Sequence, residues 1–190
     1  MAQDFRLILA SRSPRRRELL KAMGYEFETC SPDVDEHVSA HADEAVAILA
    51  RRKADAAARQ ISSGWILASD TLVSLDGRAL GKPADGAEAA RMLRALSGRT
   101  HDVFTGVCLL DAATGRQTVR VARTQVRFRL ISDGEIDQYI QTGEPMDKAG
   151  AYAIQGGAGR FVEALDGSFE NVMGFPVDDV REMLDEFTRG

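Results

Sequence analysis

Apolar and polar residues alternate along this chain in blocks that predict strands interleaved with helices. Five runs are rich in apolar and β-branched residues, which is typical of strands. These runs are FRLILA (5–10), EFETCSP (26–32), WILASDTLVSL (65–75), VFTGVCLLD (103–111) and QTVRVARTQVRFRLI (117–131). The last run alternates apolar with polar positions, as a half-exposed antiparallel strand does. Its alternating apolar residues are Val119, Val121, Val126, Phe128 and Leu130.

Helical spacing and capping residues predict five helices between and after these strands. The expected helices are Pro14 to Gly24, Asp43 to about Ser63, Asp85 to Leu96, Ser132 to Ile140, and Pro176 to Phe187. Ser13 precedes a proline at a first helical position, where a serine side chain can cap the helix. SDGE at 132–135 has the form of a capping box. Because the middle strands are expected to be antiparallel, the fold class predicted is α/β with a mixed sheet flanked by helices.

Composition limits the chain to one domain, 1–190, or to two small lobes that share one core. The chain has 190 residues, of which 44% are hydrophobic and 28% charged, as in ordinary globular proteins. No apolar run is long enough to cross a bilayer, so no membrane partner is expected. The first residues lack the basic start and long apolar stretch of a signal peptide, which favours a cytoplasmic protein.

The charge and the rarer residue types narrow the choice of ligand. The net charge is −5, which argues against a nucleic-acid partner, because such a partner needs a broad basic surface. Cys30 and Cys108 are too few for a disulfide framework and are expected to be reduced. The histidines His37, His41 and His101 match no common metal-binding spacing.

Three arginines lie at the N-terminal end of the first predicted helix, where cations are unfavourable. Arg15, Arg16 and Arg17 follow Pro14, where the helix dipole disfavours each cation by about 0.3–1 kcal/mol. Arg15 and Arg16 become favourable if a phosphate sits in the loop between strand and helix, since guanidinium groups and free N–H groups both bind it. The Ser11 and Ser13 hydroxyls would add donors. The alternative is a solvated basic helix start without a ligand.

Two charged residues stand among apolar neighbours. Lys53 falls in the middle of the apolar side of its predicted helix, and Asp70 interrupts an apolar strand. Such groups need a partner, a cation or an exit to water. Asp70 is therefore a candidate metal ligand or general base, with Thr71 next to it as a hydrogen-bonding group. The alternatives are a lysine that extends to solvent and a carboxylate that caps a loop.

Two loops add further charged candidates. The loop DVDEH carries Asp33, Asp35 and Glu36, which together with Asp70 could hold a hard divalent ion. Lys82 lies between a glycine and a proline in a predicted turn. A solvated acidic loop and an ordinary turn lysine are the alternatives. Taken together, the cations and carboxylates match the needs of phosphoryl chemistry on a polyphosphate.

The sequence resembles the Maf family of nucleoside triphosphate pyrophosphatases over nearly its whole length. The motifs that carry the resemblance are LILASRSPRRRELL, VDE, RRKA, ASDTLV, GKP, LSGRTHDVFTGV, DKAGAYAIQG and GSFENVMGFPV. The resemblance implies hydrolysis between the α and β phosphates, giving a nucleoside monophosphate and pyrophosphate. It also implies a divalent cation, Mg2+ or Mn2+, and often a homodimer. The implied fold is related to the inosine triphosphate pyrophosphatases, with a cleft between two lobes.

The family's roles carry over to matching residues of this chain. The resemblance makes Asp70 the proton acceptor for the attacking water and a metal-site residue together with Glu36. It assigns the triphosphate to five residues, which are Ser11, Arg15, Arg16, Lys53 and Lys82.

Three positions resemble the branch of the family that acts on dTTP and UTP. They are Arg15, Thr71 and Gln155, where the branch that acts on 7-methyl-GTP tends to carry tryptophan, glutamine and glutamate. The Gln155 amide can donate and accept, which suits the O4/N3–H edge of uracil or thymine. Phe169 and Glu170 depart from the family's pattern of a tyrosine followed by a small or polar residue.

Three other functions stay open at this stage. One is a nucleotide-binding regulator of cell division that would not need Asp70. A second is a 7-methyl-GTP-type pyrophosphatase. The third is a phosphatase with an aspartyl intermediate, which SDTL resembles only in part, because Leu72 stands where that chemistry needs a second aspartate.

Overall fold

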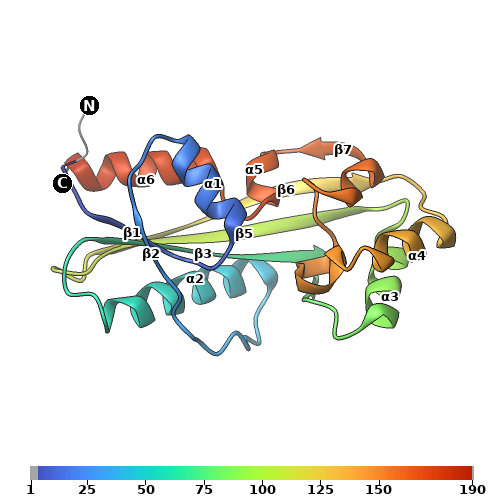
Figure 1. Cartoon of the computed structure of the whole chain (residues 1–190), viewed down its shortest axis with the longest axis horizontal. Coiled ribbons are helices and arrows are strands. Elements are labelled where there is room, and N and C mark those ends of the chain that lie inside the picture. Colours follow the sequence, from blue (N-terminus) through green and yellow to red (C-terminus); the bar gives the residue numbers. More distant parts are fainter. Residues whose placement is uncertain (1–3, 190) are drawn as a thin grey trace.

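The computed structural model describes residues 4–189, so both ends of the predicted domain 1–190 lie outside the described residues. Its strands form one seven-stranded mixed sheet with helices on both faces (Figure 1). The strands are β1 (Leu7–Ala10), β2 (Glu28–Cys30), β3 (Trp65–Leu75), β4 (Arg78–Leu80), β5 (Thr100–Asp111), β6 (Gln117–Phe128) and β7 (Val162–Asp166). The predicted fold class is confirmed.

The sheet is parallel at one side and antiparallel at the other. Its strand order is β2-β1-β3-β5-β6-β7, with the short β4 paired to the end of β3. Strand β1 runs parallel to β2 and β3, whereas the pairs β3–β5, β5–β6 and β6–β7 are antiparallel. The long strands β3, β5 and β6 run through the whole molecule (Figure 1).

The helices pack against the sheet near both of its ends. They are α1 (Pro14–Ala22), α2 (Ala42–Ala58), α3 (Gly86–Leu96), α4 (Asp133–Gln141), α5 (Phe169–Val172) and α6 (Val177–Arg189). Short 3-10 turns lie at η1 (Glu144–Asp147), η2 (Ala149–Ala151) and η3 (Gly157–Phe161). Helices α1 and α6 cover one face at the first end and α2 covers the opposite face, while α3 and α4 pack at the other end (Figure 1).

Helix α2 lies close to the sheet because a glycine faces it. A Cβ atom on Gly106 of β5 would come within 2.3 Å of the Val46 carbonyl oxygen in α2. The buried side of α2 contains mostly small residues, which are Ala42, Ala45, Val46, Leu49, Ala50, Ala54 and Ala57. This close packing fixes the distance between α2 and the strand next to β5, which is β3.

Several predicted boundaries need correction. The second helix ends at Ala58 and not near Ser63, because the amides of Gln60 and Ile61 both bond back to the Ala57 carbonyl and the chain then turns into β3. Strand β6 ends at Phe128, so Leu130 lies beyond it and is 81% exposed.

Other corrections concern shorter stretches. Strand β2 covers only Glu28–Cys30, and β5 begins three residues early, at Thr100. Ser13 is at the N-cap of α1, but its side chain makes no capping bond; its amide donates to Ser11 Oγ instead. The capping box from Ser132 to Glu135 is present. Within residues 4–189, no helix has the length and apolar character that crossing a membrane requires.

Candidate active site

A cleft of about 1210 Å³ opens where the two ends of the molecule meet. Its walls come from segments far apart in the chain, which are residues 10–16, 31–36, Leu49 and Lys53 of α2, 70–73 of β3, 81–82, Val103, 147–149, 152–154 and 172–174. A smaller cavity of about 270 Å³ lies elsewhere, along β6 beside Ser168 and Asn171. The larger cleft contains almost all of the charged residues that the sequence singled out.

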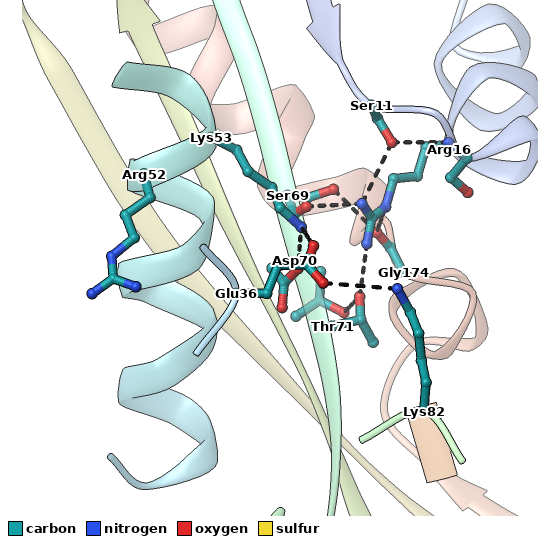
Figure 2. A network of polar contacts seen from close by, with 12 residues as sticks. Ser11, Arg16, Glu36, Arg52, Lys53, Ser69, Asp70, Thr71, Lys82 and Gly174 are labelled. Atoms are coloured by element: carbon teal, nitrogen blue, oxygen red, sulfur yellow. Dashed lines mark hydrogen bonds and ion pairs between the residues drawn. The ribbon is translucent and has the colours of Figure 1, made fainter. Parts of the chain in front are cut away.

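Asp70 and Lys53 form a mostly buried ion pair in this cleft. Lys53 Nζ lies 2.5 Å from Asp70 Oδ1, and only 14% and 12% of the two side chains are exposed (Figure 2). Lys53 is on the inward side of α2, as its position among apolar residues predicts. Asp70 points from β3 toward that helix. Each of these charges therefore has the partner that burial requires.

Glu36 completes the cluster from the acidic loop. Lys53 Nζ lies 2.8 Å from Glu36 Oε1, so one ammonium group contacts two carboxylates (Figure 2). Lys82 Nζ approaches the other Glu36 oxygen at 3.8 Å. The hydrogen bond from Lys53 holds the pKa of Glu36 below its ordinary value, and the charges of Lys82 and Arg16 act in the same direction. Glu36 is thus kept ionised in the cleft.

Arg16 bonds to neutral oxygens on the opposite wall. Its Nε donates to the Gly174 carbonyl at 2.8 Å, and its Nη1 donates to the Ser69 carbonyl at 2.8 Å. Its Nη2 donates to Thr71 Oγ1 at 3.2 Å, and Nη1 also reaches Ser11 Oγ at 3.5 Å (Figure 2). Burial lowers the pKa of Arg16, an effect that the nearby Asp70 charge opposes. Arg16 therefore joins the start of α1, strand β3 and the segment before α6.

Thr71 continues this network into the core. Its hydroxyl lies 2.9 Å from the Thr105 hydroxyl, which in turn donates to the Asn171 carbonyl at 3.0 Å. The Asn171 side-chain amide donates to the Val103 carbonyl and to Thr124 Oγ1. The wall behind Asp70 is consequently built from polar groups that hold one another. Sequence reasoning missed this network beyond Thr71, because half of its acceptors are backbone carbonyls.

The other predicted residues differ in how they reach the cleft. Arg15 lines it, and its side chain makes no hydrogen bond or ion pair with any residue among 4–189. Ser11 also lines it and is buried. Gln155 is exposed and is not among the lining residues, although its neighbour Ile154 is. The structure therefore brings Asp70, Glu36 and the predicted cations together, but leaves Gln155 outside the wall.

The carboxylates suit a hard divalent ion. Across the described chain, no three histidine, cysteine or acidic side chains gather as a ready metal cage. Glu36 and Asp70 nevertheless converge on one point, now bonded to the Lys53 ammonium. Mg2+ is ordinarily held by one or two carboxylates, several waters and the phosphates of a substrate. The donor set therefore fits an ion that arrives with a nucleotide. Asp35 is engaged locally, since its carboxylate accepts from the His37 amide.

Comparison with known proteins points in the same direction as the geometry. The family described as Maf-like protein matches residues 6–187. A dTTP/UTP pyrophosphatase of Chromobacterium violaceum is 49% identical over 192 residues, covering 97% of this chain and 96% of that protein. Proteins with the same name from Pelotomaculum thermopropionicum and Bdellovibrio bacteriovorus are 46% and 45% identical. Each alignment covers 95% of this chain, and 96% and 98% of those proteins, respectively.

Proposed function

The chain belongs to the Maf family, and from this we propose that its cleft hydrolyses dTTP and UTP to the nucleoside monophosphate and pyrophosphate. The enzyme is then a nucleoside triphosphate diphosphatase, a hydrolase acting on acid anhydrides. One observation carries the proposal. The Asp70 carboxylate lies in a cleft whose walls also present Lys53, Lys82 and Arg15.

In this proposal Asp70 is the proton acceptor for the attacking water. Its Oδ1 is bonded to Lys53, so the carboxylate is fixed in direction while its second oxygen can accept a proton. A general base must lie within hydrogen-bonding distance of the water that it activates, and a base of this kind contributes about 10²–10⁴-fold to the rate. The Asp70 side chain lines the cleft and is 12% exposed, so a water molecule in the cleft can contact it.

The cations hold the phosphates in two different ways. Arg15, Lys53, Lys82 and the Ser11 hydroxyl can contact phosphate oxygens directly, since charge-assisted hydrogen bonds to phosphate are strong. Arg16 lines the cleft but is bonded to neutral protein oxygens, so it supplies positive charge at the wall and keeps Thr71 in place. Preorganised charge of this kind stabilises a transition state without reorientation during the reaction.

Glu36 and Asp70 would hold the divalent cation, Mg2+ or Mn2+. When bound, such an ion neutralises phosphate charge and polarises the bond to be broken. The Lys53 ammonium contacts both carboxylates. Lys53 must therefore turn from at least one of them toward a phosphate when the ion and nucleotide enter together.

The preference for dTTP and UTP rests on Arg15, Thr71 and Gln155, the three positions that resemble this branch. The Gln155 amide follows Ile154, which lines the cleft, so a modest movement of this segment would bring the amide to a base. An amide matches the donor and acceptor edge of uracil or thymine. We also propose that the protein acts in the cytoplasm as a homodimer, which light scattering coupled to size-exclusion chromatography tests through the mass.

The experiment that tests the proposal follows pyrophosphate release from a panel of nucleoside triphosphates with Mg2+ and with Mn2+. We expect kcat/KM to be highest for UTP and dTTP, and 18O from water to enter only one product. Asp70→Asn should bind UTP but turn it over at least about 10²-fold more slowly. Asp166→Asn, an exposed aspartate of β7, is the matched control and should retain full activity.

Other outcomes would replace this function with one of its alternatives. Binding of UTP without hydrolysis by the unaltered protein indicates a nucleotide-binding regulator. A higher kcat/KM for 7-methyl-GTP reverses the assignment made from Gln155. Phosphate trapped on Asp70 indicates a covalent intermediate, and normal turnover by Asp70→Asn rules out the assigned base.

A further inference from the structure

A third lysine lines the active-site cleft. The chain has only four lysines, and Lys53, Lys82 and Lys148 all line this one cleft, whereas Lys21 is exposed on α1. Lys148 lies between η1 and η2 and lines the cleft together with Arg15 of α1. Its side chain is only 17% exposed. A lysine that is so covered and faces a charged cleft needs an anionic partner.

The partner that Lys148 has in the structure is a weak one. It pairs with Asp147, the preceding residue, whose carboxylate is 76% exposed. Water and salt screen such an exposed carboxylate, so the pair contributes little to holding the ammonium. The Lys148 ammonium can therefore exchange Asp147 for a phosphate while its stem stays in place.

The backbone fixes Lys148 beside Lys82. The Gly150 amide donates to the Gly81 carbonyl at 3.0 Å, which ties the segment after Lys148 to the residue before Lys82. The Lys148 carbonyl accepts from the Ala151 amide, so this turn is itself hydrogen-bonded. The two lysines thus come from adjacent, connected segments at one side of the cleft.

Arg15 of α1 lines the same cleft and lies near this pair. The hydrogen bond from Lys148 holds the pKa of Asp147 below its ordinary value, and the charge of Arg15 contributes in the same direction. Asp147 therefore lies within electrostatic reach of two cations, Lys148 and Arg15. Among the cleft cations, Lys53 holds two carboxylates and Arg16 holds neutral oxygens. Arg15 makes no side-chain bond among the described residues, Lys82 lies 3.8 Å from Glu36, and Lys148 pairs only with the exposed Asp147. A polyphosphate can therefore readily bind these three cations.

We propose that Lys148 is a phosphate-binding residue of this cleft, acting with Arg15 and Lys82. Its ammonium group is paired with Asp147 only until a polyphosphate binds. The proposal rests on the proposed function, which supplies a polyphosphate substrate. It adds a residue for which neither the family resemblance nor the sequence pattern supplied a role. The ligand class that Lys148 recognises is the phosphate chain, independent of the base.

Binding of inorganic tripolyphosphate, measured by isothermal titration calorimetry, tests this directly because the probe has no base and requires no hydrolysis. Lys148→Met should weaken binding at least about tenfold, the usual effect of losing one charged hydrogen bond. Lys148→Arg should restore most of it, since guanidinium also binds phosphate. Lys21→Met is the matched control and should bind as the unaltered protein does.

Asp147→Asn separates phosphate binding from a merely structural ion pair. If Asp147 competes with phosphate, removing its charge should leave tripolyphosphate binding equal or tighter, with an unchanged melting temperature. Tripolyphosphate binding by Lys148→Met within twofold of the unaltered protein would overturn the proposal. Failure of the proposed function looks different, because the unaltered protein would then hydrolyse no triphosphate while its tripolyphosphate affinity still reports on Lys148.

Discussion

Two half-buried cations on either side of β3 illustrate how one site uses charge in different ways. Lys53 bonds to the carboxylates of Asp70 and Glu36, so its charge is balanced locally. Arg16 bonds to carbonyl and hydroxyl oxygens and makes no ion pair among the described residues, so its charge acts on Asp70 and Glu36 only from a distance. The planar guanidinium, with several donors in fixed directions, suits the second arrangement better than an ammonium would. A lysine at position 16 could not join the same three segments.

His101 is a buried residue whose ionisation couples stability to pH. It lies behind the cleft wall, with Nε2 2.9 Å from the Tyr152 hydroxyl, and Tyr152 itself lines the cleft. Its Nδ1 is buried without a hydrogen-bond partner among the described residues. Burial lowers the pKa of His101 from 6.5 to about 4, against a smaller opposing effect of Asp102. The folded protein therefore favours the neutral ring.

Stability should consequently fall as the pH decreases from about 6.5 toward 4. In that range the unfolded chain binds a proton at His101 that the folded chain does not, so acid favours unfolding. At 1.4 kcal/mol per unit, the loss is about 3 kcal/mol. Urea unfolding across this range measures it. His101→Gln keeps a hydrogen-bonding group near Tyr152 without a titrating ring, so its curve should be flatter.

The control for this prediction is the exposed His37. His37→Gln should show the same dependence on pH as the unaltered protein. Parallel curves for the unaltered protein and His101→Gln would contradict the prediction, since the remaining slope would then come from other groups.

At the scale of elements, the packing of α2 against β5 sets the position of Lys53. Gly106→Ala would place a methyl group 2.3 Å from the Val46 carbonyl oxygen, so α2 must move away from the sheet. Overpacking of this kind costs about 1–3 kcal/mol of unfolding free energy. The same movement should separate Lys53 from Asp70 and lower kcat for UTP. Denaturant unfolding and steady-state kinetics measure the two effects.

Gly134→Ala provides the matched control for that substitution. Among the described residues, a Cβ atom built on Gly134 in α4 has no atom within 4 Å apart from its neighbours in the helix, and alanine favours helices. Its stability should be equal or slightly higher, and its activity unchanged. Equal stability of the Gly106 and Gly134 variants would show that α2 tolerates displacement at this point.

The order of the elements could be predicted from the sequence because each long element has a strong pattern of its own. The pairing of Lys53 with Asp70 could also be predicted, since each charge lies among apolar residues and needs a partner. The acceptors of Arg16 could not be found in this way. They include carbonyls of Gly174 and Ser69, which any residue type could provide.

The sequence did not predict the short elements or the exposed ends of the strands, for a related reason. The three residues of β4 have no apolar alternation of their own and are fixed by pairing with β3. Leu130 continues the alternation of β6 but lies outside it, because the Arg129 amide bonds to the Phe161 carbonyl and the chain leaves the sheet. Lys148 lies in the quoted motif DKAG, but only its burial and its place in the cleft single it out.

At the scale of the whole molecule, the two ends of the fold depend on the same strands. Strand β3 gives Leu67 to the apolar cluster under α1 and α6, and Val73 to the cluster under α3 and α4. Strand β5 does the same with Val107 and Val103. If one end unfolds, the other loses part of its own core. These two ends, the two lobes of the molecule, are therefore expected to unfold as one cooperative unit.

Differential scanning calorimetry should show a single transition, with a calorimetric enthalpy equal to the van't Hoff enthalpy. Because the cleft is walled by both lobes, a non-hydrolysable UTP analogue should raise the temperature of that one transition without splitting it. A ligand at 100 times its dissociation constant adds about 2.7 kcal/mol to the unfolding free energy, enough for a shift of several degrees. Two resolved transitions, only one of them raised by the analogue, would show that the shared strands do not couple the lobes. In that case the cleft would lie between two independent units, and binding would have to draw them together.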